Sequence, residues 1–113
     1  MKTAELTGAA LDWAVAKCEG VEVLVIERQI VHPEDYEPST KWAIGGPIIE
    51  REKIGVTPIT VTVGDDRGKR HWFANHEDKT DFQDGPTPLI AAMRCYVASK
   101  LGAEVELPKE LQP

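Results

Sequence analysis

The sequence predicts a small soluble α+β domain, and two kinds of pattern carry this prediction. Residues 7–18 and 87–101 have helical apolar spacing with cap residues at both ends, whereas 21–31 and 57–74 are rich in β-branched residues. A chain of 113 residues suits one domain, residues 1–113. A domain of this length buries roughly two thirds of its unfolded surface around a single core. We therefore expect strands and helices to share one core.

The first predicted helix spans Thr7–Cys18. Thr7 is a suitable N-cap and Gly20 suits a left-handed stop. Trp13 falls opposite the main apolar stripe of this helix, so it faces something other than the main core. We expect Trp13 to pack against a loop, and a pocket or a second subunit are the alternatives.

Three strands are expected. Val21–Val31 is rich in β-branched residues and predicts one strand, bent near Arg28. Thr57–Val63 alternates apolar and polar residues, which is typical of a strand with one buried face. The turn that follows contains a glycine, and Lys69–Ala74 can return as the partner strand, which would bring Trp72 into the sheet. The sequence thus predicts a hairpin in the middle of the chain.

The second half ends in the clearest helix. Asn75–Gly85 is polar and acidic, and we expect a surface loop anchored by Phe82. Thr87 is a good N-cap, Pro88 fits the first helical position and Gly102 ends the run. This helix has a bulky apolar stripe and a second stripe of alanines and Cys95, so it is expected between two layers or at a dimer contact.

The stretch Tyr36–Arg51 concentrates residues that shape the backbone beside an aromatic ring. Pro47 is expected to open a short helix there, and Gly45 and Gly46 would let a ligand approach its free amides. The hydroxyls of Ser39 and Thr40 complete a phosphate cradle. The alternative is architectural: one hydroxyl caps a short helix, and the two glycines separate that helix from the next.

Composition and spacing argue against several classes of function. The net charge of −6 opposes binding to nucleic acid, and no apolar run is long enough to span a membrane. The start of the chain lacks a signal-sequence pattern, so a cytoplasmic setting is expected. The spacing of His32, His71 and His76 predicts no metal site, and neither Cys18 nor Cys95 has a base nearby in the sequence. We expect no cofactor, no metal and no catalytic residue.

Three blocks of the sequence carry a family resemblance: ELTGAALDWAVAKCEG, PSTKWAIGGPIIERE and GPTPLIAAMRCYVASKLG. In this order they resemble the NinX-like family of small bacteriophage and prophage proteins of unknown function. The layout is also similar to small phage proteins that form α-β-α sandwiches. The resemblance implies a small antiparallel sheet with helices on both faces, in a protein made in an infected or lysogenic bacterial cytoplasm.

The resemblance together with the Tyr36–Arg51 stretch favours a non-catalytic small-molecule binder. Such a protein would sequester a nucleotide-derived defence signal of the host, such as a cyclic or conjugated ADP-ribose. The expected ligand contacts are Ser39, Thr40, Trp42, Gly45, Gly46, Arg51, Trp72, Asn75 and Thr87. Trp42 would stack a ring of the ligand, Arg51 would supply a positive charge and Thr87 would close the site. A homo-oligomer is expected, with Trp13 or the alanine stripe of the last helix at its contact.

Two other classes of function stay open. One is a protein-binding module that inhibits a host enzyme, which would display exposed aromatic residues and no ligand-sized cavity. The other is a small nucleotide-cleaving enzyme, which would need an ionisable pair such as His71 or His76 with Glu52.

Overall fold

The computed structural model describes residues 1–77 and 81–113. The elements in chain order are the 3₁₀ turn η1 (Thr3–Glu5), helix α1 (Gly8–Glu19), strands β1 (Leu24–Ile26) and β2 (Gln29–Val31), helix α2 (Trp42–Glu52), strands β3 (Ile54–Thr60), β4 (Arg70–His76) and β5 (Phe82–Gly85), helix α3 (Pro88–Leu101) and the 3₁₀ turn η2 (Lys109–Leu111). Strands β1 and β2 form one antiparallel sheet, and β3, β4 and β5 form another in that order. The predicted α+β class is confirmed.

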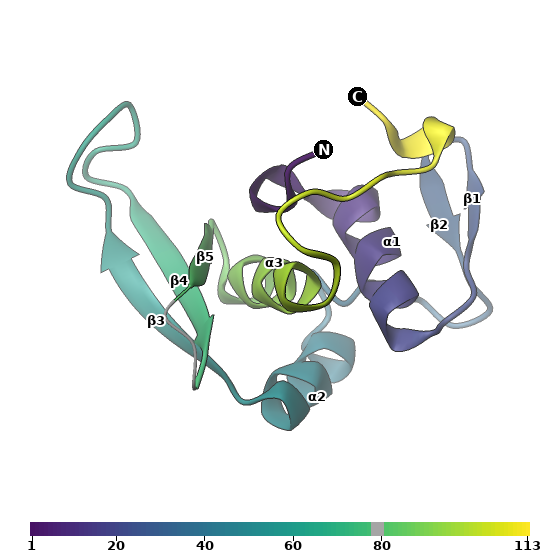
Figure 1. Ribbon diagram of the computed structural model, residues 1–113, viewed down its shortest axis with the longest axis horizontal. Helices are drawn as coiled ribbons and strands as arrows, with labels where there is room; N and C mark the ends of the chain where they lie inside the picture. Colours follow the sequence, from purple (N-terminus) through teal and green to yellow (C-terminus); the bar gives the residue numbers. More distant parts are fainter. Residues whose placement is uncertain (78–80) are drawn as a thin grey trace.

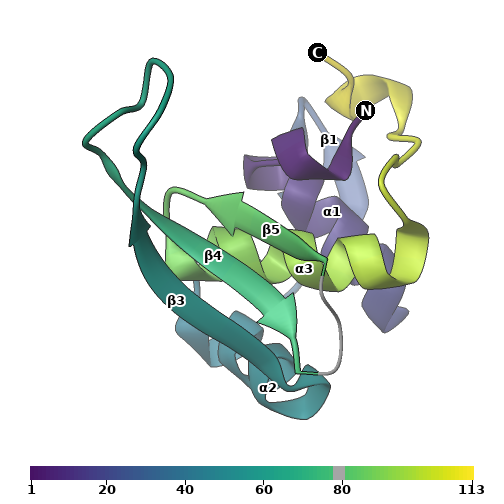
Figure 2. The ribbon, with the colours of Figure 1, turned by 60° about the vertical axis from the view of Figure 1, so that its left-hand side comes forward.

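The helices lie between the two sheets (Figure 1). Helix α3 runs across one face of the β3–β4–β5 sheet, with α2 beside it (Figure 2). Helix α1 packs on the far side of α3 and carries the β1–β2 hairpin on its own outer side. The layering therefore differs from the expected sandwich. The described helices all lie on one face of the three-stranded sheet, and the β1–β2 sheet packs against the outer side of α1.

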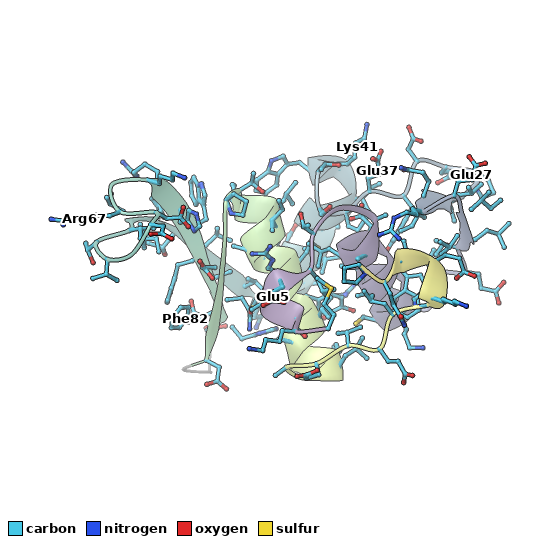
Figure 3. All side chains as sticks on the ribbon, turned by 90° about the horizontal axis from the view of Figure 1, so that it is seen from above. Glu5, Glu27, Glu37, Lys41, Arg67 and Phe82 are labelled. Atoms are coloured by element: carbon cyan, nitrogen blue, oxygen red, sulfur yellow. The ribbon has the colours of Figure 1, made fainter. Side chains whose placement is uncertain are left out.

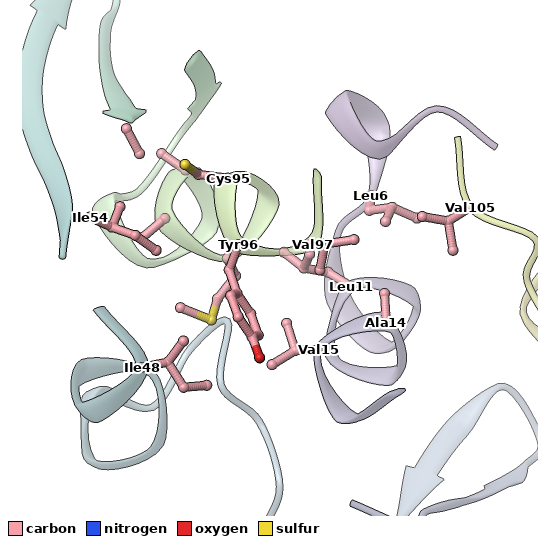
Figure 4. Packing of buried hydrophobic residues seen from close by; sticks show 14 of the residues in the cluster. Leu6, Leu11, Ala14, Val15, Ile48, Ile54, Cys95, Tyr96, Val97 and Val105 are labelled. Atoms are coloured by element: carbon pink, nitrogen blue, oxygen red, sulfur yellow. The ribbon is translucent and has the colours of Figure 1, made fainter. Parts of the chain in front are cut away.

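The core gathers around α3 because this helix is apolar on nearly every side. Tyr96 is buried among Val15 of α1 and Ile48 of α2, while Cys95 points toward the sheet (Figure 4). In the alanine stripe of α3, Ala91 and Ala92 are buried within the chain, where Ala91 packs against Gly85 of β5, whereas Ala98 is partly exposed. Most of this stripe therefore packs within the chain, and its role as a subunit contact stays a prediction.

Helices α1 and α3 follow their predicted boundaries. Gly20 ends α1 with φ of 71°, and the hydroxyl of Thr87 accepts a hydrogen bond from the amide of Ile90 at 3.1 Å. Thr7 occupies the N-cap position of α1, but its side chain makes no capping hydrogen bond.

The predicted single strand Val21–Val31 is two strands. Glu27 and Arg28 adopt left-handed backbone conformations with φ of 50° and 64°, and they form a two-residue turn between β1 and β2. Positive φ at both central residues is the geometry of a type I′ hairpin turn, whose usual residues are Asn and Gly. Because Glu-Arg is not such a pair, the sequence gives no sign of this turn and predicts one continuous strand.

The central hairpin is confirmed, with its strands displaced along the chain. Strand β3 begins at Ile54 and ends at Thr60, so Val63 lies in the connection and is 76% exposed. Residues 61–69 project beyond the body of the molecule (Figure 2). Pro58 lies in β3, an edge strand, where a missing N–H costs no ladder bond.

The predicted loop Asn75–Gly85 contains an additional strand. Residues 78–80 lie outside the described residues, and Phe82–Gly85 forms β5 at the edge of the sheet. Phe82 is 55% exposed and its ring lies 4.6 Å from that of Phe73, centroid to centroid. Phe82 therefore packs on a neighbouring strand and is not the buried anchor that we expected.

Helix α2 is longer than expected. It begins at Trp42, so Pro47 lies inside the helix and does not open it. The amide of Gly45 donates to the carbonyl of Lys41 at 2.9 Å, so this amide is already bonded within the helix. The expected phosphate cradle at Pro47 is wrong because the helix start lies five residues earlier.

The two ends of the chain lie side by side (Figure 1). The amide of Thr3 donates to the carbonyl of Ala103, and the amide of Val105 donates to that of Met1, both at 2.8 Å. Leu107 and Leu111 are buried. The tail, residues 103–113, therefore contributes side chains to the core. In the part of the chain that the structure describes, no helix has the length and apolar character of a membrane span.

Candidate functional site

A polar cavity of about 800 Å³ lies where the start of α1 meets the β1–β2 turn and the loop before α2. Its wall is formed by residues 7–10 and Asp12 at the start of α1, residues 27–30 of the hairpin, and residues 35–37, 39 and 40 of the loop, with His32 and Leu111. This volume is in the range of small-molecule sites.

Asp12 and Ser39 form the floor of this cavity. Asp12 is 5% exposed and Ser39 is 2% exposed. The amide of Ser39 donates to Asp12 Oδ1 at 2.8 Å, which ties the loop to α1. Burial raises the pKa of Asp12 to about 6, although the hydrogen bonds from Ser39 act in the opposite direction. A carboxyl with this pKa changes its charge close to neutral pH.

The hydroxyl of Ser39 is buried and makes no hydrogen bond of full geometry among the described residues, although it lies close enough to the Asp12 carboxyl to lower its pKa. Buried polar groups are normally hydrogen-bonded, because an unpaired one retains its desolvation cost. Ser39 lines the cavity, so this hydroxyl is a candidate hydrogen-bonding group for a molecule bound there.

The start of α1 contributes main-chain donors to the same wall. The first N–H groups of a helix have no partner within the helix, and the side chain of Thr7 does not cap them. Gly8, Ala9 and Ala10, which carry these N–H groups, line the cavity. A helix start of this kind favours an oxygen that carries negative charge.

Acidic side chains outnumber basic ones around the cavity. Asp12, Glu27, Asp35 and Glu37 line it, and Figure 3 shows Glu27 and Glu37 on the same side of the molecule. Arg28 is the guanidinium in the wall, and it donates to the carbonyls of Glu110 and Gln112 at 3.2 and 2.9 Å. The cavity can therefore bind hydroxyl groups through carboxylates, but it disfavours ligands with high negative charge.

The structure brings two of the expected ligand contacts together. Ser39 and Thr40 line the cavity, whereas Trp42 does not; it is the first residue of α2 and is 56% exposed. Gly45 is buried, and a β-carbon there would lie 2.5 Å from the carbonyl oxygen of Pro38. Gly45 is thus needed for packing. Gly46 has no such contact, since the nearest atom to an added β-carbon is Trp42 Cε3 at 3.8 Å.

Arg51 lies at the far end of α2 from the cavity. Its guanidinium makes two hydrogen bonds to the Glu19 carboxylate, at 3.0 and 2.6 Å, and one to Glu52 at 3.0 Å. The hydroxyl of Tyr96 donates to Glu19 in the same group. The hydrogen bonds from Arg51 lower the pKa of Glu19, while burial and then the bond to Glu19 raise that of Tyr96. Arg51 therefore joins α1, α2 and α3.

The three remaining expected contacts lie on other parts of the fold. Trp72 packs against the core, and Asn75 lies in β4 opposite Phe82, with its amide nitrogen 3.2 Å from the carbonyl of His76. Thr87 caps α3 through its hydroxyl. None of the three belongs to the cavity wall that Ser39 lines.

Sequence reasoning missed Asp12, Arg28 and Tyr36 as residues of this cavity. Asp12 stands beside the apolar stripe of the first helix, and a buried aspartate within a helix is the signal that could have pointed to it. Tyr36 is half-buried, and burial raises its pKa to about 12. Among the described residues, no group of three or more His, Cys, Asp or Glu is arranged to hold a metal ion.

We compared the sequence of the chain with those of known protein families. The family described as Bacteriophage P22, NinX matches residues 2–100. The chain belongs to this NinX family. The matched region includes α1, the β1–β2 turn and the loop before α2, which supply most of the cavity wall, whereas Leu111 and η2 lie beyond it. No curated protein matches the chain.

Proposed function

We propose that this NinX-family protein binds a small ribose-containing molecule in the cavity at the start of α1 and does not transform it. The proposed role is to sequester a nucleotide-derived defence signal, such as a cyclic or conjugated ADP-ribose, in the cytoplasm of the infected or lysogenic bacterium. The observation that carries this proposal is the hydroxyl of Ser39, which lies in the cavity wall beside an uncapped helix start and makes no hydrogen bond of full geometry among the described residues.

The hydrogen-bond donors of the cavity wall suit the phosphates of such a ligand, and the acceptors suit its ribose hydroxyls. The amides at the start of α1 suit a phosphate oxygen, because no side chain caps them and they lie at the positive end of the helix dipole. Carboxylates such as Asp35 and Glu37 suit ribose hydroxyls, as an acidic residue does in dinucleotide-binding folds. Because four carboxyl groups face one guanidinium, the proposed ligand carries few phosphates and several hydroxyls.

Calorimetry and thermal-shift measurements with purified protein test the proposal. We expect cyclic ADP-ribose and ADP-ribose to raise the melting temperature, and ATP, with its higher charge, to raise it less. After heat denaturation the ligand should be released intact, since an enzyme would release product. If none of these nucleotides stabilises the protein, the proposal is wrong.

Ser39→Ala examines the residue that carries the proposal. Losing one hydrogen bond of about 1 kcal/mol should weaken binding by about fivefold. Ser99→Ala is the matched control, because the hydroxyl of Ser99 donates to the carbonyl of Tyr96 within α3 and lies outside the cavity. Equal effects of the two substitutions would remove Ser39 from the binding site.

A protein-binding module is the second candidate, and one surface favours it. Leu24, Ile26 and Val31 are 64%, 53% and 44% exposed on the outer side of the β1–β2 hairpin. Next to them, an apolar hollow of about 720 Å³ is lined by Trp13, Leu24 and Val31. Exposed apolar groups of this kind mark contacts with other proteins, including the proposed second copy of this chain.

Light scattering on Ile26→Lys distinguishes the two candidates. If this face joins two copies or a host protein, the substitution should dissociate the complex and leave ribonucleotide binding unchanged. A complex that persists in Ile26→Lys would exclude the hairpin face as its contact.

A further inference from the structure

Three ionisable side chains from different elements meet beneath the three-stranded sheet. Cys95 of α3 lies with its sulfur 3.5 Å from Nδ1 of His76 in β4. Nε2 of the same imidazole lies 3.9 Å from Oε1 of Glu52, the last residue of α2. Figure 4 shows Cys95 on the side of α3 that faces the strands. The chain thus aligns a thiol, an imidazole and a carboxylate in that order.

This order is the one that activates a nucleophile. A neutral imidazole with its proton on Nε2 directs that proton toward Glu52 and leaves Nδ1 to accept the thiol proton. The carboxylate then stabilises the imidazolium that forms. The distances are long for hydrogen bonds, as such contacts often are before a ligand binds.

A cavity gives small molecules access to this group. It has a volume of about 570 Å³ and is lined by Cys95 and His76 together with Asp81, Gln83 and Ser99. Glu52 also contacts Arg51 at 3.0 Å and Lys100 at 3.9 Å. The charged groups around the imidazole are therefore Glu52 with its two cations from α2 and α3, and Asp81 at the cavity wall.

We propose that Cys95 is an activated thiol that exchanges with small neutral disulfides entering this cavity. In the step, the Cys95 proton passes to Nδ1 of His76 and the thiolate attacks one sulfur of the disulfide. A new S–S bond forms at Cys95 while the original S–S bond breaks. The leaving thiolate takes the proton from the imidazolium and departs as a thiol, so one disulfide is consumed and one is formed.

Cys18 provides an internal reference for this reactivity. It is more exposed than Cys95, so accessibility alone would make Cys18 react first. Burial raises the pKa of the Cys18 thiol to about 11, and no histidine is hydrogen-bonded to it in the described part of the chain. The proposal therefore predicts the opposite order of reaction from the one that exposure predicts.

The experiment treats the full chain with 2-hydroxyethyl disulfide at pH 7 and follows each cysteine by peptide mapping in a mass spectrometer. We expect Cys95 to form the mixed disulfide at least about a hundredfold faster than Cys18, which is the size of a general-base contribution. In urea, where the fold is lost, the two rates should become equal. Faster reaction at Cys18 in the native chain would overturn the proposal.

Substitution of the imidazole separates activation from packing. His76→Gln should slow the reaction at Cys95 by about tenfold or more, since the proton acceptor is gone. His71→Gln is the matched control, because His71 lies in the same strand, on the face of the sheet turned away from α3, 3.2 Å from Asp84. If the two variants react alike, the histidine contact has no role. Glu52→Gln, which keeps the size of the side chain, should also slow Cys95, and an unchanged rate there would exclude the carboxylate.

Discussion

A β-carbon at Gly45 would lie 2.5 Å from the carbonyl oxygen of Pro38 and 2.6 Å from Leu89 Cδ2. The first of these atoms belongs to the main chain and cannot rotate away. We therefore expect Gly45→Ala to lower the free energy of unfolding by about 1–3 kcal/mol. Gly46→Ala in the same helix is the control and should raise it by up to about 1 kcal/mol, because alanine favours the helix and has room there. Urea unfolding measures both, and similar effects would contradict this packing argument.

Asp12 makes stability depend on pH in an unusual direction. Its pKa is about 6 in the folded chain against an ordinary value of 3.8, so the folded chain binds this proton more readily than the unfolded chain. The contribution of Asp12 to stability therefore falls as pH rises from about 4 to about 6 and is constant above that.

Asp12→Asn should remove the loss of stability that ionisation of Asp12 causes. The side-chain oxygen of the asparagine can still accept a hydrogen bond from the amide of Ser39. Relative to the wild type, the variant should gain stability between pH 4 and pH 7, by up to about 3 kcal/mol for two pKa units. Glu19, whose pKa is lowered, gives a slope of opposite sign that is present in both proteins. Thermal unfolding across this pH range measures the difference, and a constant difference would show that Asp12 does not titrate as described.

Residue types alone identified half of the polar floor of the cavity. Ser39 was expected at a ligand site because hydroxyls precede a glycine pair in the sequence. Its partner Asp12 lies 27 positions earlier, on a helix whose apolar stripe gave no reason to bring it to the same loop. Contacts between distant segments depend on how helices pack, which local spacing does not encode.

At the scale of elements, the β1–β2 turn is the least favourable local sequence. Glu27 and Arg28 both have positive φ, which costs energy for residues with a β-carbon. We expect Glu27→Asn to raise the free energy of unfolding by about 0.5–1 kcal/mol, because asparagine tolerates this conformation. Arg28 is left in place because it binds the tail carbonyls.

Glu22→Asn is the matched control for this turn substitution. Glu22 is exposed, lies just before β1 and has no positive φ, so the same change of charge should bring no gain. Equal stabilisation by both variants would mean that charge, and not turn geometry, is responsible. Urea unfolding is again the measurement.

Helices with capping residues were predictable, and the elements around them were less so. Helices α1 and α3 begin at hydroxyl residues and end at glycines, and their boundaries follow from these local signals. Helix α2 begins at Trp42 after Lys41, which has no capping side-chain bond, and contains Pro47. Packing of Gly45 and Ile48 against the rest of the chain stabilises this helix. The first residue of the helix could therefore not be predicted from a capping residue.

At the scale of the whole molecule, the order of the layers could not be predicted, because the β1–β2 hairpin had been predicted as one strand. With β1 and β2 folded back, a second sheet covers α1, and the cavity forms between its turn and the loop before α2. The sequence could therefore suggest the class of fold and one side of the cavity. The opposite side of the cavity is formed by the β1–β2 turn. The position of this turn could not be predicted, because its two residues with positive φ are not glycines.

The tail, residues 103–113, closes the molecule. Its backbone pairs with residues 1–3, and Leu107 is 4% exposed in the core. We expect Leu107→Ala to lower the free energy of unfolding by about 2–5 kcal/mol, as for other buried leucines. Leu24→Ala is the control, since this side chain is 64% exposed and its loss should change stability by less than about 0.5 kcal/mol. If the two substitutions cost the same, the tail is not packed as described, and truncation after Gly102 should then leave the melting temperature unchanged.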